Sequence, residues 1–80
     1  MNDGSIFEQI ERLSEEEFSL EEAHPGKRMS ETERARLREI EVQLDQCYDL
    51  LRQRRARRAA GLDPDEATLR SETTVEGYLQ

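Results

Sequence analysis

Hydrophobic residues recur at helical spacing over residues 5–23, with steps of four, three and seven positions between them. This spacing is typical of the buried seam of a coiled-coil-like helix. Ser5 followed by Glu8 matches a capping box, and a His-Pro-Gly sequence follows residue 23, so we predict a helix over this range. Phe7 and Phe18 lie about three turns apart and widen one edge of the hydrophobic stripe. The predicted seam consists of Ile6, Ile10, Leu13 and Leu20.

A second and stronger helical pattern covers residues 30–60, where hydrophobic residues alternate at steps of three and four. Ser30 and Glu33 match a capping box at its start, and Gly61 suits the position just after its end. A helix of this length is not held by intrinsic propensity alone and needs a partner along its seam. The predicted seam consists of Leu37, Ile40, Leu44, Cys47, Tyr48 and Leu51.

The residues after Gly61 contain a third helix signal. Asp63 suits the N-cap, Pro64 suits the first helical position and Glu66 falls at the third, so we predict a short helix over residues 63–70. Residues 71–80 are rich in β-branched side chains, and we expect them to form an extended tail. Its only hydrophobic anchors are Val75, Tyr78 and Leu79.

The short connection between the two long helices favours an antiparallel hairpin, so the predicted fold is all-α, with residues 1–80 forming a single domain. The last three turns of the second helix, from about Leu51 to Ala60, are expected to project beyond the first helix. A lone hairpin buries too little surface to offset the ordering of its chain. We therefore expect the C-terminal segment to pack back and two hairpins to pair into a four-helix bundle, which makes the protein a homodimer.

Charge is distributed by segment, and it sums to −7. Residues 1–26 hold eight acidic residues and one arginine, residues 27–60 hold ten basic and six acidic residues, and residues 61–80 hold five acidic residues and one arginine. Acidic flanks around a basic middle indicate that the chain partly neutralises itself or a second copy. With one cysteine, no internal disulfide, no signal-peptide pattern and no apolar run of about 18 residues, we expect a cytoplasmic protein that does not enter a membrane.

The densest cluster of charge is an arginine block over residues 52–58. Such a block binds acidic protein surfaces or phosphates, or it forms a solvated helix end that pairs with acidic segments of its own assembly. The chain has no tryptophan, which argues against base stacking and thus against nucleic acid. The predicted contact surface consists of Arg52, Arg54, Arg55, Arg57, Arg58, Asp63, Asp65, Glu66 and Tyr78.

Candidate chemical groups are few. Glu21 and His24 have the Glu-x-x-His spacing of di-iron helical bundles, but the seam of the second helix offers no carboxylate to complete such a site. We therefore predict no metal and no cofactor. Cys47 lies among leucines and is expected to be a buried structural thiol. The chain shows no serine–histidine pattern, glycine-rich phosphate loop or paired cysteines, so we predict that it is not an enzyme.

Residues 44–58 read LDQCYDLLRQRRARR, Asp63–Ala67 read DPDEA, and residues 75–80 read VEGYLQ. These segments resemble a family of short bacterial proteins known only as a domain of unknown function, which shares the QLDQC-x-DLLRQRRARR core and the DPDEA segment. The resemblance is close over the second helix and the C-terminus. Over the first helix, only the pattern of residues is similar. It implies that these segments act as one functional unit, but it implies no activity, cofactor or catalytic residue.

We therefore expect a non-enzymatic helical protein that acts through protein–protein contacts at its arginine-rich helix end. The alternative is a small nucleic-acid or nucleoprotein-associated factor that contacts phosphates through residues 52–58.

Overall fold

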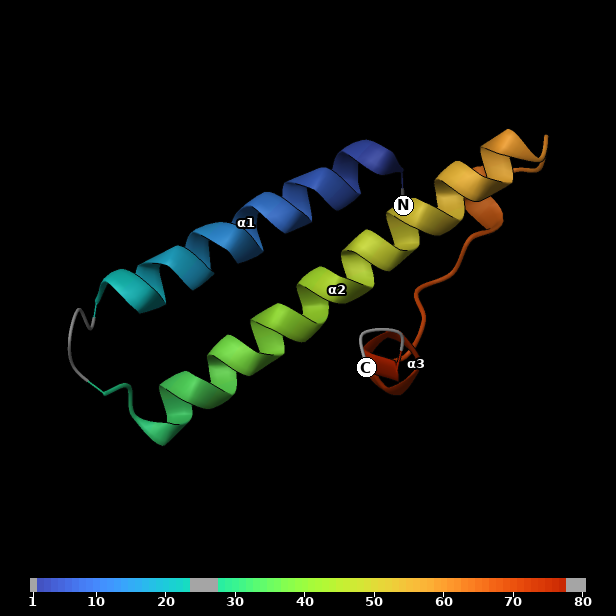
Figure 1. Cartoon of the computed structure of the whole chain (residues 1–80). Helices are drawn as coiled ribbons and strands as arrows, with labels where there is room; N and C mark the ends of the chain where they lie inside the picture. The colour runs from blue at the N-terminus through green and yellow to red at the C-terminus, as the bar shows by residue number, and fades with distance from the viewer. Residues whose placement is uncertain (1, 24–27, 78–80) are drawn as a thin grey trace.

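The computed structural model describes residues 2–23 and 28–77, and over these residues the fold is all-α, as predicted. Two long helices, α1 and α2, are followed by a 3-10 turn, η1, and a short helix, α3 (Figure 1). No strand is formed within the described part of the chain. The bounds are α1 Asp3–Glu22, α2 Glu31–Ala59, η1 Pro64–Glu66 and α3 Glu72–Gly77.

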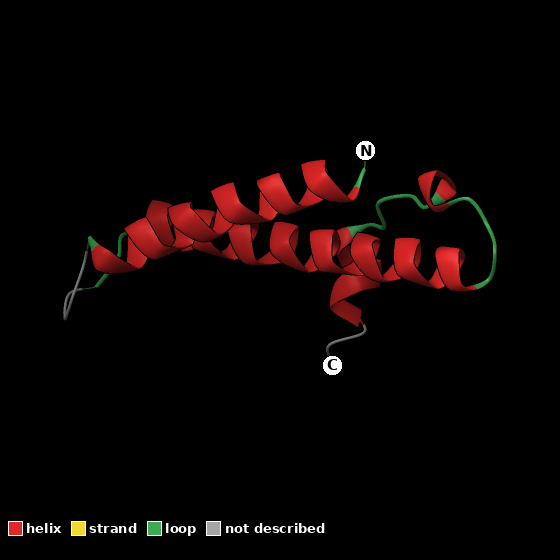
Figure 2. Cartoon of the chain, turned by 90° about the horizontal axis from the view of Figure 1, so that it is seen from above, coloured by secondary structure: helices red, strands yellow, loops and turns green. Residues whose placement is uncertain are grey.

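The long helix α2 is the central element of the structure. The helix α1 runs antiparallel to it along one side, while α3 packs on the other side and η1 lies near its C-terminal end (Figures 1 and 2). The chain extends over 50 × 26 × 15 Å, so the helices form a single layer that is one helix thick at most points. Such a layer leaves two broad faces open and encloses little volume.

The N-cap of α1 is Asn2, and the prediction that Ser5 caps this helix is wrong. The Asn2 Oδ1 atom accepts a hydrogen bond from the Ser5 N–H at 2.8 Å, and the Ser5 Oγ atom accepts one from the Asn2 N–H at 3.2 Å. Ser5 is therefore the third helical residue of a capping box that starts three positions earlier than expected. The helix gains a first turn that contains Asp3, an acidic residue that suits the positive end of the helix dipole.

Both ends of α2 are defined by the residues that the pattern indicated. The Ser30 hydroxyl accepts a hydrogen bond from the Glu33 N–H at 3.1 Å, and the Glu33 carboxylate accepts one from the Ser30 N–H at 3.0 Å. At the other end, Gly61 has a φ of +73°, and the N–H of Leu62 donates to the carbonyl of Arg57 at 2.8 Å. This left-handed ending needs glycine because a side chain is strained there.

The predicted helix over residues 63–70 is wrong beyond its first turn. Asp63 caps η1 as expected, with its carboxylate accepting from the Asp65 N–H at 2.9 Å, but Ala67 already has extended backbone at ψ 139°. The extended path is fixed by side chains of α2. The amide of Gln53 donates to the Thr68 carbonyl at 2.8 Å, which replaces a bond that a continuing helix would have made within itself.

The predicted extended tail over residues 71–80 is also wrong, because α3 forms within it. The Ser71 hydroxyl accepts from the Thr74 N–H at 3.2 Å, as an N-cap side chain does, and Val75 is only 1% exposed. Burial of Val75 and this cap outweigh the low helix propensity of the β-branched residues. Tyr78 and Leu79 lie outside the described residues.

The core is one cluster between α1 and α2 that the chain after η1 partly covers. Tyr48, which the periodicity placed in the seam, is 44% exposed, so that prediction is wrong. Ala67, in the segment after η1, packs against the cluster. The buried members are Ile6, Leu13, Ile40, Leu44, Cys47 and Leu50, with Ile10, Leu20 and Leu51 packed against them. Leu37, also predicted in the seam, is half-buried.

Truncating the core should unfold so small a chain. We expect Leu44→Ala to lower the free energy of unfolding by about 2–5 kcal/mol, because Leu44 is 8% exposed in this cluster. The matched control is Leu69→Ala, the same truncation at a side chain that is 58% exposed, which should change it by less than ~0.5 kcal/mol. Urea unfolding followed by far-UV circular dichroism measures both, and equal losses would contradict the assigned core.

Candidate functional site

Arg54 lies at the centre of the arginine block and is 5% exposed. Its Nε atom donates to a carboxylate oxygen of Asp3 in the first turn of α1. Its Nη1 atom donates to the Asp65 carboxylate at 3.0 Å and to the Pro64 carbonyl at 3.1 Å, both in η1. One guanidinium therefore connects α1, α2 and the segment after α2. A buried cation needs this number of partners, because removal from water is costly unless the charge is paired.

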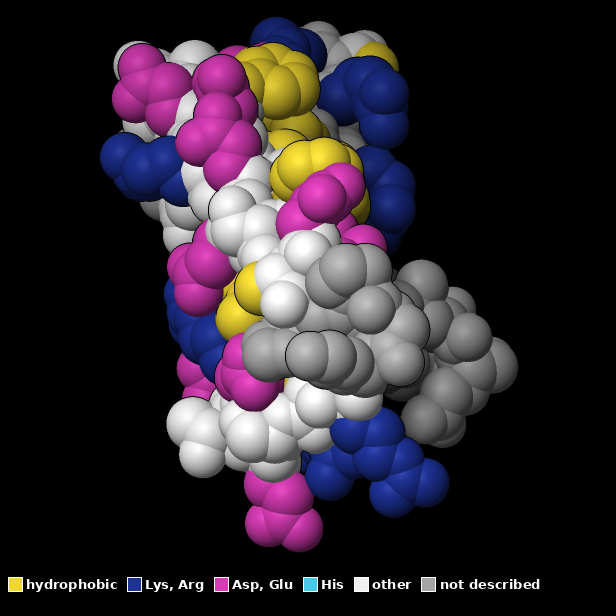
Figure 3. All heavy atoms as spheres, turned by 90° about the vertical axis from the view of Figure 1, so that its left-hand side faces the viewer, with side chains coloured by type: hydrophobic (Ala, Val, Ile, Leu, Met, Phe, Trp, Pro, Cys, Tyr) yellow, Lys and Arg dark blue, Asp and Glu magenta, His cyan; other side chains and the backbone are white. Residues whose placement is uncertain are grey.

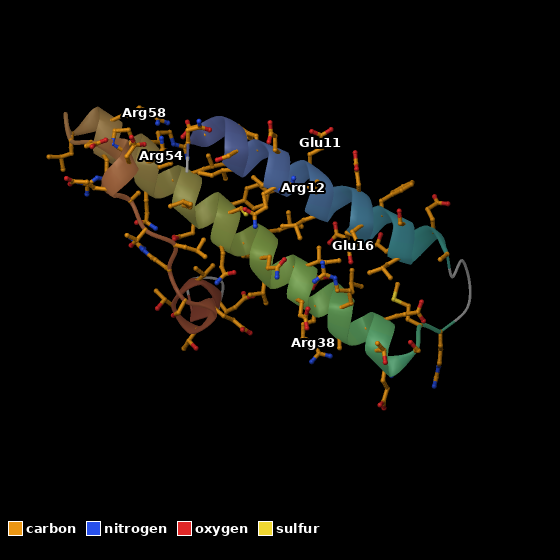
Figure 4. The ribbon with its side chains drawn as sticks, turned by 180° about the vertical axis from the view of Figure 1, so that it is seen from behind. Glu11, Arg12, Glu16, Arg38, Arg54 and Arg58 are labelled. Atoms are coloured by element: carbon orange, nitrogen blue, oxygen red, sulfur yellow. The ribbon has the colours of Figure 1, made fainter. Side chains whose placement is uncertain are left out.

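Two further arginines of the block also bind within the chain. Arg58 donates from Nη2 to the Asp3 carboxylate at 2.7 Å (Figure 4). Arg57 donates from Nη2 to Glu66 at 2.7 Å and from Nε to the Asp63 carbonyl at 2.6 Å. The acidic flanks of the sequence thus neutralise its basic middle within one molecule.

The last turns of α2 project beyond the N-terminal end of α1, as predicted (Figures 1 and 2). The side chains of Arg54 and Arg58 nevertheless reach back from this part of α2 to Asp3 in the first turn of α1. The contact is possible because arginine side chains are long and because α1 begins at Asp3 rather than Ser5.

These contacts divide the predicted contact surface into two groups. One group is engaged in intramolecular contacts through side chain or backbone. The other keeps its charged ends at the surface: Arg55 is exposed, and Arg52 only approaches Asp49, at 4.0 Å, with 54% of its side chain exposed. The engaged group consists of Arg54, Arg57, Arg58, Asp63, Asp65 and Glu66; Tyr78 lies outside the described residues.

The exposed arginines border a groove between α1 and α2. Phe7 of α1 and Tyr48 of α2 line it and remain 57% and 44% exposed, respectively. Leu51 forms part of its apolar lining, and Arg52 and Arg55 lie along the α2 side. We call this site the aromatic–arginine groove. The sequence offered one signal for it, the placement of Phe7 outside the heptad seam, but that signal did not indicate which residues of α2 would lie opposite.

Ion pairs and burial shift the acidity of several groups. The hydrogen bonds from Arg54 and then Arg58 lower the pKa of Asp3, and Arg36 lowers the pKa of Glu16 by bridging α1 and α2 at 2.7 Å. Burial raises the pKa of Cys47, which keeps its thiol protonated and unreactive.

The acidity of Glu76 in α3 also departs from that of a free side chain. Desolvation, followed by the neighbouring carboxylate of Asp45, raises the pKa of Glu76, and Glu72 and Glu41 act in the same direction. The contact between α3 and α2 therefore brings like charges together at one edge of the layer.

Within residues 2–23 and 28–77, no three side chains of histidine, cysteine, aspartate or glutamate are grouped so that they could hold a metal ion. None of the helices formed by these residues combines the length and the apolar character needed to cross a bilayer. His24, part of the Glu-x-x-His pattern, lies outside the described residues.

The family described as "Protein of unknown function (DUF2630)" matches residues 2–80. Uncharacterized protein Rv0898c of Mycobacterium tuberculosis (strain ATCC 25618 / H37Rv) is 58% identical over 55 residues, which cover 69% of this chain and 62% of that protein. Uncharacterized protein Mb0922c of Mycobacterium bovis (strain ATCC BAA-935 / AF2122/97) matches to the same extent. The match thus spans less than two thirds of the length of these relatives. No solved structure matches the chain.

The Asp3 ion pairs should make stability depend on pH. Because the pKa of Asp3 is lower in the folded chain than its ordinary value of 3.8, the unfolded state binds more protons near that pH. The stabilisation is present above 3.8 and is lost as the pH falls through the depressed value. We expect Asp3→Asn to lower the free energy of unfolding at pH 6, and the difference from wild type to shrink towards pH 3.

Urea unfolding at both pH values measures this difference. The control is Glu11→Gln, which removes an exposed carboxylate of α1 that points away from α2 (Figure 4). It should leave the stability nearly unchanged at either pH. An Asp3→Asn effect of equal size at pH 6 and pH 3 would contradict the proposed role of the carboxylate charge.

Proposed function

The chain belongs to the family of unknown function DUF2630, and we propose that it is a non-enzymatic protein that acts through protein–protein contacts at the aromatic–arginine groove. The observation that supports this most is the composition of the groove. Phe7, Tyr48 and Leu51 offer an accessible apolar surface, and Arg52 and Arg55 flank it. Aromatic and arginine side chains are the types most enriched at the energetic centres of protein interfaces.

The proposal narrows the contact surface that the sequence indicated. Arg54, Arg57 and Arg58 are engaged in contacts that hold the chain together, so a partner that competed for them would weaken the fold. Arg52 and Arg55 can pair with an acidic partner without that cost. We accordingly expect the partner to present carboxylates next to an apolar side chain.

Charge and thiol chemistry support two further parts of the proposal. The groove lies on a chain of net charge −7, whereas a phosphate-binding surface is more often part of a basic protein, which favours a protein partner over nucleic acid. The one cysteine is buried as a free thiol, which is the usual state in a reducing compartment and supports a cytoplasmic location.

The test is affinity capture by the full chain from an extract of cells that naturally express it. The double variant Arg52→Glu, Arg55→Glu should recover at least ~10-fold less of a protein partner than wild type, because both groove arginines then repel carboxylates. The control is Arg34→Glu, Arg38→Glu, which makes the same change of charge at exposed positions near the other end of α2. It should capture as wild type does, and circular dichroism should show equal helix content in all three proteins.

Nuclease treatment and salt separate the two partner classes. Capture that survives nuclease, and that changes little between about 50 and 200 mM salt, supports the proposal. Capture of nucleic acid that weakens by orders of magnitude over that range would overturn it in favour of phosphate contacts. Equal capture by the two double variants would show that the aromatic–arginine groove does not bind the partner.

A further inference from the structure

The aromatic–arginine groove continues along α1 as an exposed face. Phe18 is 63% exposed and lies eleven residues after Phe7, which is about three turns and so places both rings on one side of the helix. Glu11 and Ser14 fall between them on the same side, and Ser14 and Phe18 line a hollow of their own. Viewed from the end of the molecule where α1 leads to α2, hydrophobic side chains reach the surface between acidic and basic groups (Figure 3). The α1–α2 seam does not cover this face, because that seam is formed by the opposite edge of the hydrophobic stripe.

The spacing of residues on this face is symmetric about the middle of α1. If a second copy of α1 is laid antiparallel on the first with its centre between residues 12 and 13, Phe7 of each copy meets Phe18 of the other. Glu11 then meets Ser14, so no carboxylate of this row faces another. Self-complementarity of this kind is what a two-fold symmetric interface requires, since the same patch must serve on both sides.

The charged residues at the two ends of this face are also complementary in the antiparallel arrangement. The N-terminal end of the face lies beside Arg52 and Arg55, which border the groove around Phe7. Asp3 also lines this groove, and its charge is neutralised by two arginines of its own chain. The C-terminal end of α1 carries Glu21 and Glu22, both exposed, just beyond Phe18. In the antiparallel arrangement the acidic end of each copy lies over the arginine end of the other, and the pairing occurs twice.

We propose that the occupant of the aromatic–arginine groove is a second copy of this chain, with Phe18 of each copy seated beside Phe7 and Tyr48 of the other. The inference rests on the proposed function, because it names the partner of the same groove. The homodimer differs from the one that the sequence indicated, which used the heptad seams. Those seams are occupied within one chain, so the interface is formed by the outward-facing aromatic row instead.

Sedimentation velocity of the full chain from about 1 to 100 μM tests the proposal, with wild type expected to show a monomer–dimer equilibrium. Phe18→Glu should raise the dimer dissociation constant at least ~10-fold, because it places a charge against the apolar surface of Phe7 and Tyr48 of the other copy. The control Leu69→Glu introduces the same charge at an exposed leucine outside this face and should leave it unchanged. Wild type that remains monomeric over this range, or a dimer that Phe18→Glu does not weaken, would overturn the proposal.

A charge exchange provides the specific test. The variant Arg52→Glu, Arg55→Glu and the variant Glu21→Arg, Glu22→Arg should each dimerise at least ~10-fold more weakly than wild type, since like charges then meet at both ends of the interface. An equimolar mixture of the two should recover dimers, because both ends of a mixed dimer pair opposite charges. The arginines introduced near the C-terminus of α1 suit the helix dipole and should not unfold it.

The mixture also separates the inference from the function it rests on. A mixture that stays monomeric would overturn the self-association. If, in that case, wild type captures a different protein and the Arg52→Glu, Arg55→Glu variant does not, the proposed function stands with that protein as the partner. If the mixture dimerises, the partner of the groove is the chain itself.

Discussion

The buried guanidinium of Arg54 is the contact on which the rest of the structure depends. It lies where three parts of the chain meet, and its partners Asp3, Asp65 and the Pro64 carbonyl come from the first turn of α1 and from η1. A charge in this position is tolerated only when all of these groups are in place. The pairing therefore fixes how far α1 reaches along α2, and it turns the chain back after Gly61 so that Ala67 can cover the core.

A single layer of helices follows from this arrangement. With α1 on one side of α2 and α3 on the other, few side chains are enclosed, and Val75 and the α1–α2 cluster supply most of the buried surface. The same geometry leaves Phe7 and Tyr48 accessible between the long helices. A molecule of this shape has broad surfaces, and the aromatic–arginine groove lies on one of them.

Local signals in the sequence predicted the two long helices. Contacts between distant residues determine the role of Arg54 and the formation of α3, and these were not predicted. Periodicity and the Ser30 capping box located α2 because both depend on neighbours within one or two turns. The start of α1 was misplaced because Asn2 and Ser5 are both good caps, and only the structure distinguishes them. The role of Arg54 could not be predicted, since its bond to Asp3 spans 51 positions and any of five arginines could have made it. The helix α3 was missed because the burial of Val75 against α2 is likewise a tertiary effect.

The interaction free energy between Asp3 and Arg54 tests this account most directly. It is obtained from the unfolding free energies of wild type, Asp3→Asn, Arg54→Gln and the double variant at neutral pH. If the two groups hold the layer together, the double variant will lose clearly less stability than the sum of the single losses, because either change alone already breaks the pair. Losses that add within experimental error would show that the contact does not organise the fold.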